Sequence, residues 1–159
     1  MKIRVGLGYD VHQLKKGRPC VLGGVLFDSL LGPDGHSDAD VLLHAICDAI
    51  LGAAGLRDIG FHFPNTDSSF KNAESRDLLK EVMNLVSKEG YRVVNIDATL
   101  VSEQPKISPK TQAIKDSIHG LCGIEANAVG VKATTSEKLG FIGREEGLEA
   151  QAVVLLIKD

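Results

Sequence analysis

Residues 37–55 read Ser-Asp-Ala-Asp-Val-Leu-Leu-His-Ala-Ile-Cys-Asp-Ala-Ile-Leu-Gly-Ala-Ala-Gly. Apolar side chains recur in this stretch at the three- and four-residue spacing of one helix face. Ser37 or Asp38 is suited to cap the first turn, and Gly55 is suited to end the last one. The stretch therefore predicts a helix with one buried face, formed by Val41, Leu42, Ala45, Ile46, Ala49 and Ile50.

Strand and helix patterns lie on both sides of this helix. Ile3, Val5 and Leu7 alternate with other residues, which predicts a strand with those three side chains on one buried face. We expect further strands at 20–25, 93–101, 129–134 and 148–157, helices at 75–88 and 108–121, and loops at 12–19, 31–35 and 60–71. This order predicts an α/β fold of the α+β type, a single domain over residues 1–159. Its one mixed sheet would have four to five strands, covered by helices on one face.

Composition limits the classes of function. The 159 residues are 43% hydrophobic and 25% charged with a net charge of −3, which is typical of soluble globular domains. Without a basic field, neither nucleic acid nor a membrane surface is expected as a partner. No signal or transit segment and no membrane span is recognised, and the three widely spaced cysteines, Cys20, Cys47 and Cys122, are expected as buried thiols. We therefore expect a soluble intracellular protein.

Asp10-Val11-His12 and His44 form the first candidate site. Asp10 and His12 are two residues apart on an extended chain, so their side chains share one face. His44 lies off the apolar stripe of the predicted helix, and a helix packed on the strand could bring it to the other two. Two histidines and one carboxylate with an open fourth position are typical of catalytic zinc. Unrelated polar residues remain the alternative.

Two further segments could bind phosphate. His36-Ser37-Asp38 precedes the predicted helix, and a helix start attracts anions; ordinary capping is the alternative. Residues 132–138 read Lys-Ala-Thr-Thr-Ser-Glu-Lys. Hydroxyl and ammonium groups suit phosphate oxygens, and Glu137 among them suggests a magnesium-like ion. A solvated polar turn is the alternative there.

Four motifs together resemble the 2-C-methyl-D-erythritol 2,4-cyclodiphosphate synthase family. They are Gly-Tyr-Asp-Val-His at 8–12, His-Ser-Asp at 36–38, Asp-Ile-Gly at 58–60 and Lys-Ala-Thr-Thr-Ser-Glu-Lys-Leu-Gly-Phe-Ile-Gly-Arg at 132–144. The similarity spans essentially the whole chain, in the family's order and spacing.

The resemblance implies site residues position by position. Asp10, His12 and His44 would bind one Zn²⁺, and Glu137 would bind a second divalent cation, Mg²⁺ or Mn²⁺. His36 and Thr135 would be catalytic, as stabilisers of the transition state. The substrate-binding set that it implies is Asp10, His12, His36, Ser37, Asp58, Ile59, Gly60, Phe63, Pro64, Asn65, Thr66, Asp67, Ser102, Glu103, Gln104, Pro105, Lys106, Ile107, Ser108, Thr134, Thr135, Ser136, Glu137, Phe141 and Arg144.

The resemblance also implies an activity, an assembly and a location. The location is a bacterial cytoplasm, with a mature plastid form as the less favoured alternative, because no transit segment is recognised. Members of the family are phosphorus–oxygen lyases of isoprenoid synthesis. They convert 4-diphosphocytidyl-2-C-methyl-D-erythritol 2-phosphate to the 2,4-cyclodiphosphate with release of CMP. They are homotrimers. The family segment that residues 102–108 resemble recognises cytosine through its main chain and faces the active site of a neighbouring subunit.

Three positions depart from the family pattern, and two other functions stay open. Asn65 stands where relatives commonly carry Asp, Ser68 where Pro is frequent, and Ser108 where a larger apolar residue is common. A zinc-dependent phosphohydrolase would need a general base, for which Asp40 is the obvious candidate. A non-catalytic nucleotide-binding trimer is the third possibility, although it predicts the loss of a candidate ligand, and none is missing.

Overall fold

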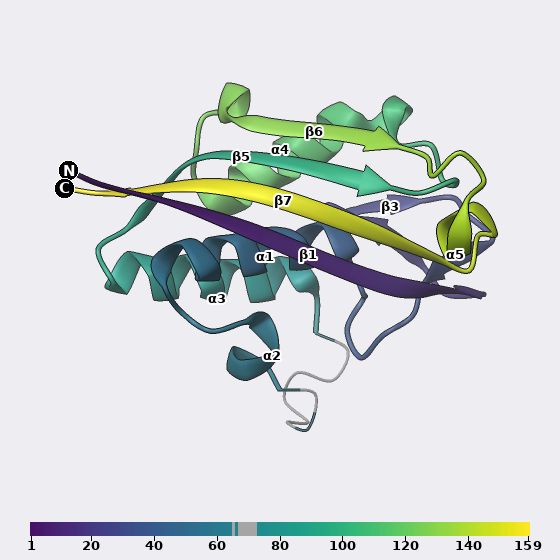
Figure 1. Cartoon of the computed structure of the whole chain (residues 1–159), viewed down its shortest axis with the longest axis horizontal. Helices are drawn as coiled ribbons and strands as arrows, with labels where there is room; N and C mark the ends of the chain where they lie inside the picture. The colour runs from purple at the N-terminus through teal and green to yellow at the C-terminus, as the bar shows by residue number, and fades with distance from the viewer. Residues whose placement is uncertain (65, 67–72) are drawn as a thin grey trace.

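The computed structural model describes residues 1–64, 66 and 73–159 of the chain (Figure 1). Five strands form a mixed sheet in the order β4-β1-β7-β5-β6, in which only β5 and β6 run parallel. A separate two-stranded sheet is made by β2 and β3. The bounds are β1 Lys2–Lys16, β2 Cys20–Leu22, β3 Val25–Phe27, β4 Leu31–Pro33, β5 Arg92–Val101, β6 Val129–Thr134 and β7 Gly147–Lys158.

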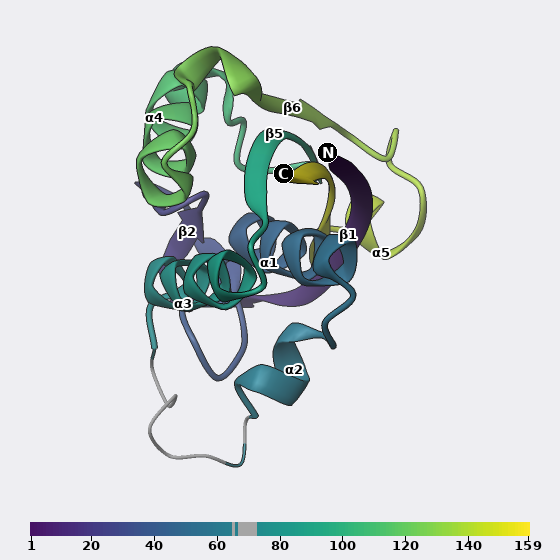
Figure 2. The ribbon, with the colours of Figure 1, turned by 90° about the vertical axis from the view of Figure 1, so that its left-hand side faces the viewer.

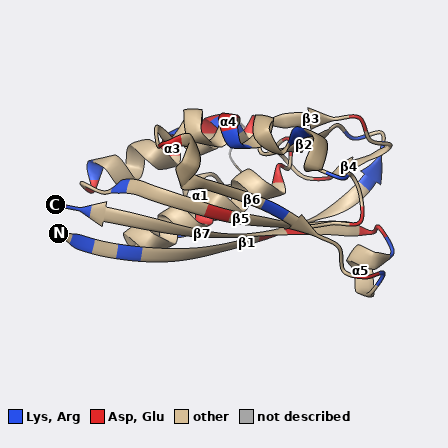
Figure 3. Cartoon of the chain, turned by 90° about the horizontal axis from the view of Figure 1, so that it is seen from above, with Lys and Arg blue, Asp and Glu red and all other residues tan. Residues whose placement is uncertain are grey.

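The longer helices cover one face of the sheet (Figure 3). Figure 2 shows α1 inside the curve of the sheet, with α3 and α4 beyond it. The helices are α1 Val41–Ala54, α2 Ile59–His62, α3 Ser75–Lys88, α4 Thr111–Cys122 and α5 Gly140–Gly143, with short 3₁₀ turns at Ser108–Lys110 and Ala126–Ala128. This arrangement confirms the predicted mixed sheet with helices on one side.

Helix α1 forms the centre of the core, but its cap differs from the prediction. The N-cap is Asp40, whose side chain accepts a hydrogen bond from Leu43 N, and not Ser37 or Asp38. Ala39 before it has a φ of +56°, and the helix begins two residues later than a cap at Asp38 would place it. Gly55 ends the helix in the left-handed conformation, as predicted. Ten of the fourteen helix residues are buried because the sheet and α3 enclose α1.

The prediction for the buried face of β1 is wrong. Ile3, Val5 and Leu7 are 58%, 64% and 69% exposed in the isolated chain, whereas Gly6 and Gly8 face inwards. A Cβ atom on Gly8 would lie 1.8 Å from the backbone oxygen of Ala45, so only glycine fits between β1 and α1. The glycine face of β1 therefore packs on the helix, and the apolar face is left open.

Other boundaries were predicted with mixed success. Helix α3 and strand β6 have the predicted bounds. Strand β5 begins one residue before the predicted strand, and β7 is one residue longer than predicted at each end. The expected loop at 12–19 is wrong in its first half, because β1 continues to Lys16 and pairs there with β4, which itself lies in an expected loop. The predicted strand at 20–25 is instead part of the β2–β3 hairpin, residues 20–27, which does not join the main sheet. The three cysteines are free and buried, as expected.

Within the described residues, no helix is long and apolar enough to cross a lipid bilayer. The expected bacterial cytoplasmic location stays a prediction.

Candidate metal and substrate site

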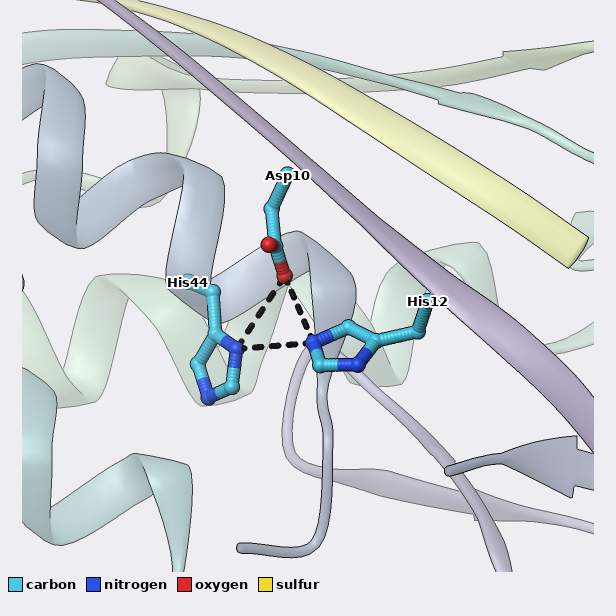
Figure 4. A group of neighbouring side chains, drawn as sticks. All are labelled: Asp10, His12 and His44. Carbon is cyan, nitrogen blue, oxygen red and sulfur yellow. Dashed lines mark hydrogen bonds and ion pairs between the residues drawn. The ribbon is translucent and has the colours of Figure 1, made fainter. Parts of the chain in front are cut away.

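Three side chains from β1 and α1 converge on one point (Figure 4). Asp10 Oδ2 lies 2.9 Å from His12 Nε2 and 3.1 Å from His44 Nδ1, and the two histidine nitrogens are 3.2 Å apart. The alternation of the extended strand places Asp10 and His12 on one face, and the close packing of α1 against Gly6 and Gly8 brings His44 to them. The grouping predicted from sequence is confirmed.

The geometry of this group fits a metal ion. Zinc bonds of about 2.0–2.1 Å in a tetrahedron place neighbouring ligand atoms roughly 3.3 Å apart, close to the observed separations. Each imidazole has a partner on its outer nitrogen: His12 Nδ1 lies 2.8 Å from Asp34 O, and His44 Nε2 lies 2.8 Å from Ser75 Oγ. Such outer contacts orient histidine ligands in metal sites. Asp10, His12 and His44 thus form a candidate metal site.

The same contacts perturb the ionisation of the metal-free group. Burial alone would raise the pKa of Asp10, but hydrogen bonds and charge from His12 and His44 hold it below its ordinary value. Burial alone would lower the pKa of His12, yet the hydrogen bond to Asp10 and its negative charge raise it. The ionised carboxylate and the protonated imidazole thus stabilise each other in the metal-free group, and a metal ion would displace the proton from His12 on binding.

A pocket opens beside the candidate ligands. His36, Ser37, Ile59, Gly60 and Phe63, all predicted site residues, line it with the ligands, Gly35 and Leu78. Asp58 caps α2 by accepting a hydrogen bond from Phe61 N at 3.2 Å, and Asp48 on α1 accepts one from Ile59 N at 2.8 Å. These two carboxylates position the backbone of α2 at the rim. Pro64 and Thr66 follow α2, whereas Asn65 and Asp67 lie outside the described residues.

The other predicted residues form a second group. Ser102, Pro105, Lys106, Ile107 and Ser108 line a separate pocket with Leu100, Thr111, Ala133, Thr134 and Thr135. The parallel pairing of β5 with β6 places these segments side by side, since both strands end there. Within one chain, no described residue lines both pockets. The predicted site is therefore divided into two halves.

Glu103 connects the two segments of the second group. Its carboxylate is 5% exposed and accepts hydrogen bonds from Ser136 N at 3.3 Å and from Lys138 N at 3.1 Å. Glu137, between those two residues, is exposed with a φ of +54° and accepts a hydrogen bond from Thr135 Oγ1 at 3.3 Å. Glu103 thus leaves only its main chain to a ligand, while Glu137 presents its carboxylate to solvent.

The remaining predicted residues, Gln104, Phe141 and Arg144, line neither of these two pockets. Phe141 is 39% exposed, and Arg144 forms a two-pronged ion pair with Glu146 at 3.0 and 2.9 Å. Gln104 is exposed and borders a third hollow near Leu30. The structure brings neither Phe141 nor Arg144 into the pocket beside the candidate metal ligands.

A family model described as the YgbB family matches residues 3–157. The chain belongs to the YgbB family. It is 56% identical to the 2-C-methyl-D-erythritol 2,4-cyclodiphosphate synthase of Cytophaga hutchinsonii over 99% of each chain. The resemblance seen in the sequence motifs is thereby confirmed.

Solved structures of the YgbB family share the fold. The bifunctional IspDF of Campylobacter jejuni matches with a TM-score of 0.95 and 44% identity; the match covers 99% of this chain and 43% of that longer one. A 2C-methyl-D-erythritol-2,4-cyclodiphosphate synthase in a CDP-bound form matches with a TM-score of 0.90 and 38% identity, over 97% of this chain and 100% of that one.

In this YgbB-family chain, Asp40 does not have the surroundings of a general base. It is fully buried, and its carboxylate accepts hydrogen bonds from Gly23 N at 2.9 Å, Gly24 N at 2.6 Å and Leu43 N at 3.1 Å. It ties the β2–β3 turn to the start of α1 and makes no side-chain contact with His44. These contacts leave the carboxylate of Asp40 without the access that the general base of a phosphohydrolase would need.

Sequence reasoning missed three residues that organise the site of this YgbB-family chain. Asp34 O contacts His12, Asp48 supports α2, and Ser75 contacts His44. Asp48 lies one helical turn after His44, and that spacing could have indicated that the two share a helix face. No local pattern marks Ser75, because it is the first residue of a helix that follows a long connection.

Proposed function

We propose that this chain is a 2-C-methyl-D-erythritol 2,4-cyclodiphosphate synthase, a phosphorus–oxygen lyase that occupies all 159 residues as one domain. It would convert 4-diphosphocytidyl-2-C-methyl-D-erythritol 2-phosphate to the cyclodiphosphate and release CMP. The convergence of Asp10, His12 and His44 beside an open pocket carries the proposal, in a chain whose full-length relatives bear that name.

Asp10, His12 and His44 would hold zinc, because two imidazoles and one carboxylate form a donor set that zinc accepts with one position left open. Glu137, exposed on its turn, would hold Mg²⁺ or Mn²⁺, which prefer oxygen ligands. When bound, the two cations would supply positive charge that neutralises the phosphate oxygens during the reaction.

The residues of the chain would mainly bind and orient the substrate. The 2-phosphate of the substrate is already largely ionised at neutral pH, since the second pKa of a phosphate monoester is near 6. One of its oxygens can therefore attack the β-phosphorus without a protein base, and CMP leaves with the electron pair of the broken P–O bond. His36 and Ser37, which line the pocket, would hold the charged oxygens in place.

The second pocket would bind the cytidine part. Its wall contains the 105–108 segment with Thr134 and Thr135, and a solved relative is described in a CDP-bound form. Main-chain groups of this segment can pair with cytosine, and Thr135 would stabilise the transition state. Because the two pockets are separate within one chain, a complete site would need the second pocket of a neighbouring subunit.

A homotrimer would supply that neighbour and cover the apolar face of β1. Ile3, Val5, Leu7, Tyr9 and Val11 form an exposed row along that strand. Solvent-exposed apolar rows of this length are typical of subunit interfaces. We therefore propose a homotrimer with three shared sites.

The test is an assay of CMP release from the cytidylyl substrate, with the second product identified by ³¹P NMR. The cyclase predicts equimolar CMP and a cyclic diphosphate without solvent oxygen. A linear product that contains ¹⁸O from labelled water would instead establish a phosphohydrolase. Nucleotide binding without turnover in the presence of Zn²⁺ and Mg²⁺ would favour the non-catalytic trimer.

A further inference from the structure

The outer ring nitrogen of His44, Nε2, faces away from Asp10 and His12 (Figure 4). It lies 2.8 Å from the hydroxyl oxygen of Ser75, a residue with no exposed surface. That hydroxyl in turn forms a short hydrogen bond with a carboxylate oxygen of Asp38. The three side chains thus form a chain of contacts from Asp38 through Ser75 to His44.

The chemistry of the groups fixes the direction of these hydrogen bonds. An ionised carboxylate only accepts, so the Ser75 hydroxyl donates to Asp38 and uses a lone pair to accept from His44 Nε2–H. With its proton on Nε2, neutral His44 has a lone pair on Nδ1, the atom that faces Asp10 and His12. The arrangement selects the tautomer that a metal ion requires at this position.

Asp38 also fixes the backbone that carries Ser75. Its two carboxylate oxygens lie 3.3 and 3.2 Å from Ser75 N, the first residue of α3, which has no capping side chain of its own. One carboxylate therefore holds both the main chain and the hydroxyl of Ser75.

Ser37 is the competing partner for His44 and is the weaker one. Its hydroxyl lies 3.3 Å from His44 Nε2 and accepts a hydrogen bond from Ala39 N at 3.0 Å. Its distance to the ring is at the long end for a hydrogen bond. Ser75 is nearer, and its acceptor role is fixed by Asp38.

We propose that Ser75 and Asp38 are positioning residues for the metal site: they hold His44 in the orientation and tautomer that present Nδ1 to the ion. The proposal rests on the metal site of the proposed function. The backbone carbonyl of Asp34 has the corresponding position at His12, so each imidazole is fixed through its outer nitrogen. Groups in such positions contribute about 10- to 100-fold to metal affinity.

The first test measures Zn²⁺ affinity of purified protein by competition with a chromophoric chelator. Ser75→Ala is expected to weaken zinc binding by about 10-fold or more. Ser117→Ala is the matched control: it removes a hydroxyl from helix α4 that has no hydrogen-bond partner, and zinc affinity should not change. Zinc affinity of Ser75→Ala within twofold of that of Ser117→Ala would overturn the proposal.

The second test separates positioning from general stability by a double-mutant cycle. Asp38 is proposed to act on the metal through Ser75, so Asp38→Asn should weaken zinc binding in the wild-type background and cause little further loss beside Ser75→Ala. If the losses in zinc affinity from the two substitutions were additive, Asp38 would not act through Ser75 and the proposal would be overturned. Thermal unfolding of the metal-free variants records any loss of folding separately, and the absorption of bound Co²⁺ reports a change in ligand geometry.

These measurements are independent of the catalytic assay. If wild-type protein binds zinc and the cycle behaves as stated but no CMP is released, the proposed function fails while the positioning role stands. If CMP is released but Ser75→Ala retains wild-type zinc affinity, the positioning role fails alone.

Discussion

Asp40 is a carboxylate held entirely by backbone N–H groups. Gly23, Gly24 and Leu43 donate to it, and it has no exposed surface. Burial raises its pKa from 3.8 to about 6, although the three hydrogen bonds act in the opposite direction. The residue that fixes the start of α1 is therefore also a proton-binding group within the core.

This raised pKa predicts a pH-dependent stability. Between pH 4 and 6 the folded chain binds a proton at Asp40 that the unfolded chain has released, so the contribution of Asp40 to the free energy of unfolding falls as pH rises. Relative to Asp40→Asn, metal-free wild type should lose roughly 1–3 kcal/mol across this range. Urea unfolding of both proteins at one concentration from pH 4 to 7 measures the difference. A difference that does not vary with pH would contradict the expectation.

Glu137 gives a second prediction, for the reaction itself. Its carboxylate is exposed beside Thr135, where a diphosphate would repel it unless a cation lay between. Glu137→Gln should keep the fold, the zinc and the oligomeric state but lower the rate of CMP release on the order of 100-fold, with partial rescue by raised Mg²⁺ or Mn²⁺. Steady-state assays over a range of Mg²⁺ concentrations measure this. Near wild-type rates at low Mg²⁺ would show that Glu137 does not bind a cation and is only a solvated charge in a turn.

The candidate ligands could be predicted from sequence, but their supports could not. Asp10 and His12 need only the two-residue repeat of a strand, and His44 needs only a helix that packs on it. Ser75 reaches His44 because two helices meet in space, and Asp34 contributes a backbone carbonyl that any residue would offer. The alternation of residue types holds no information on such contacts.

The packing of β1 on α1 depends on two glycines. Cβ atoms at Gly6 and Gly8 would lie 1.9 and 1.8 Å from backbone oxygens of α1. Backbone atoms cannot move aside as a flexible side chain can. The strand and the helix therefore approach closely enough for His44 to meet Asp10 and His12.

Gly8→Ala should consequently separate the two elements. We expect a loss of about 3 kcal/mol or more in the free energy of unfolding, at the upper end for overpacked cores, together with weaker zinc binding. Gly52→Ala is the control on helix α1, where an added methyl meets nothing within 4 Å; it should raise the free energy of unfolding by about 0.5–1 kcal/mol. Chemical unfolding of the metal-free proteins compares them. Equal stabilities would show that β1 and α1 can part without cost.

The same two glycines explain why the buried face of β1 was assigned wrongly. Period-two alternation shows that a strand has two different faces, and apolar residues usually mark the inner one. Here the inner face is defined by the absence of side chains, and the apolar face remains for another surface. The element boundaries were easier to predict, because Gly55 and Gly90 end helices through their own backbone conformations.

The open face of β1 makes a prediction for the assembled protein. Leu7→Asp would place a charge in the middle of the exposed apolar row and should convert a trimer to smaller species, with loss of CMP release. Leu26→Asp changes a residue of similar exposure, 61%, on the separate β2–β3 sheet, and should keep the trimer. Light scattering gives the masses. A wild-type monomer with full activity would exclude shared sites.

Complementation tests the sharing of sites directly. His44→Ala removes a candidate metal ligand, and Lys106→Ala alters the wall of the second pocket. Each variant alone should have little activity, whereas unfolding and refolding the two together should restore part of it in mixed trimers. Sites that lie within single chains would give no recovery on mixing.

The pairing of β1 with β7 also determines where the chain can be cut and joined. Lys2 lies opposite Lys158, so both ends of the chain emerge side by side at one end of the sheet, where β1 begins and β7 finishes (Figure 1). Asp10 is eight residues further along β1, roughly 27 Å at the rise of an extended strand. A short linker could close the chain into a circle, and new ends could be opened at a surface turn such as Gly17 without cutting the strands that carry the ligands. A fluorescent protein fused at either terminus would likewise be attached at the end of the sheet remote from the ligands.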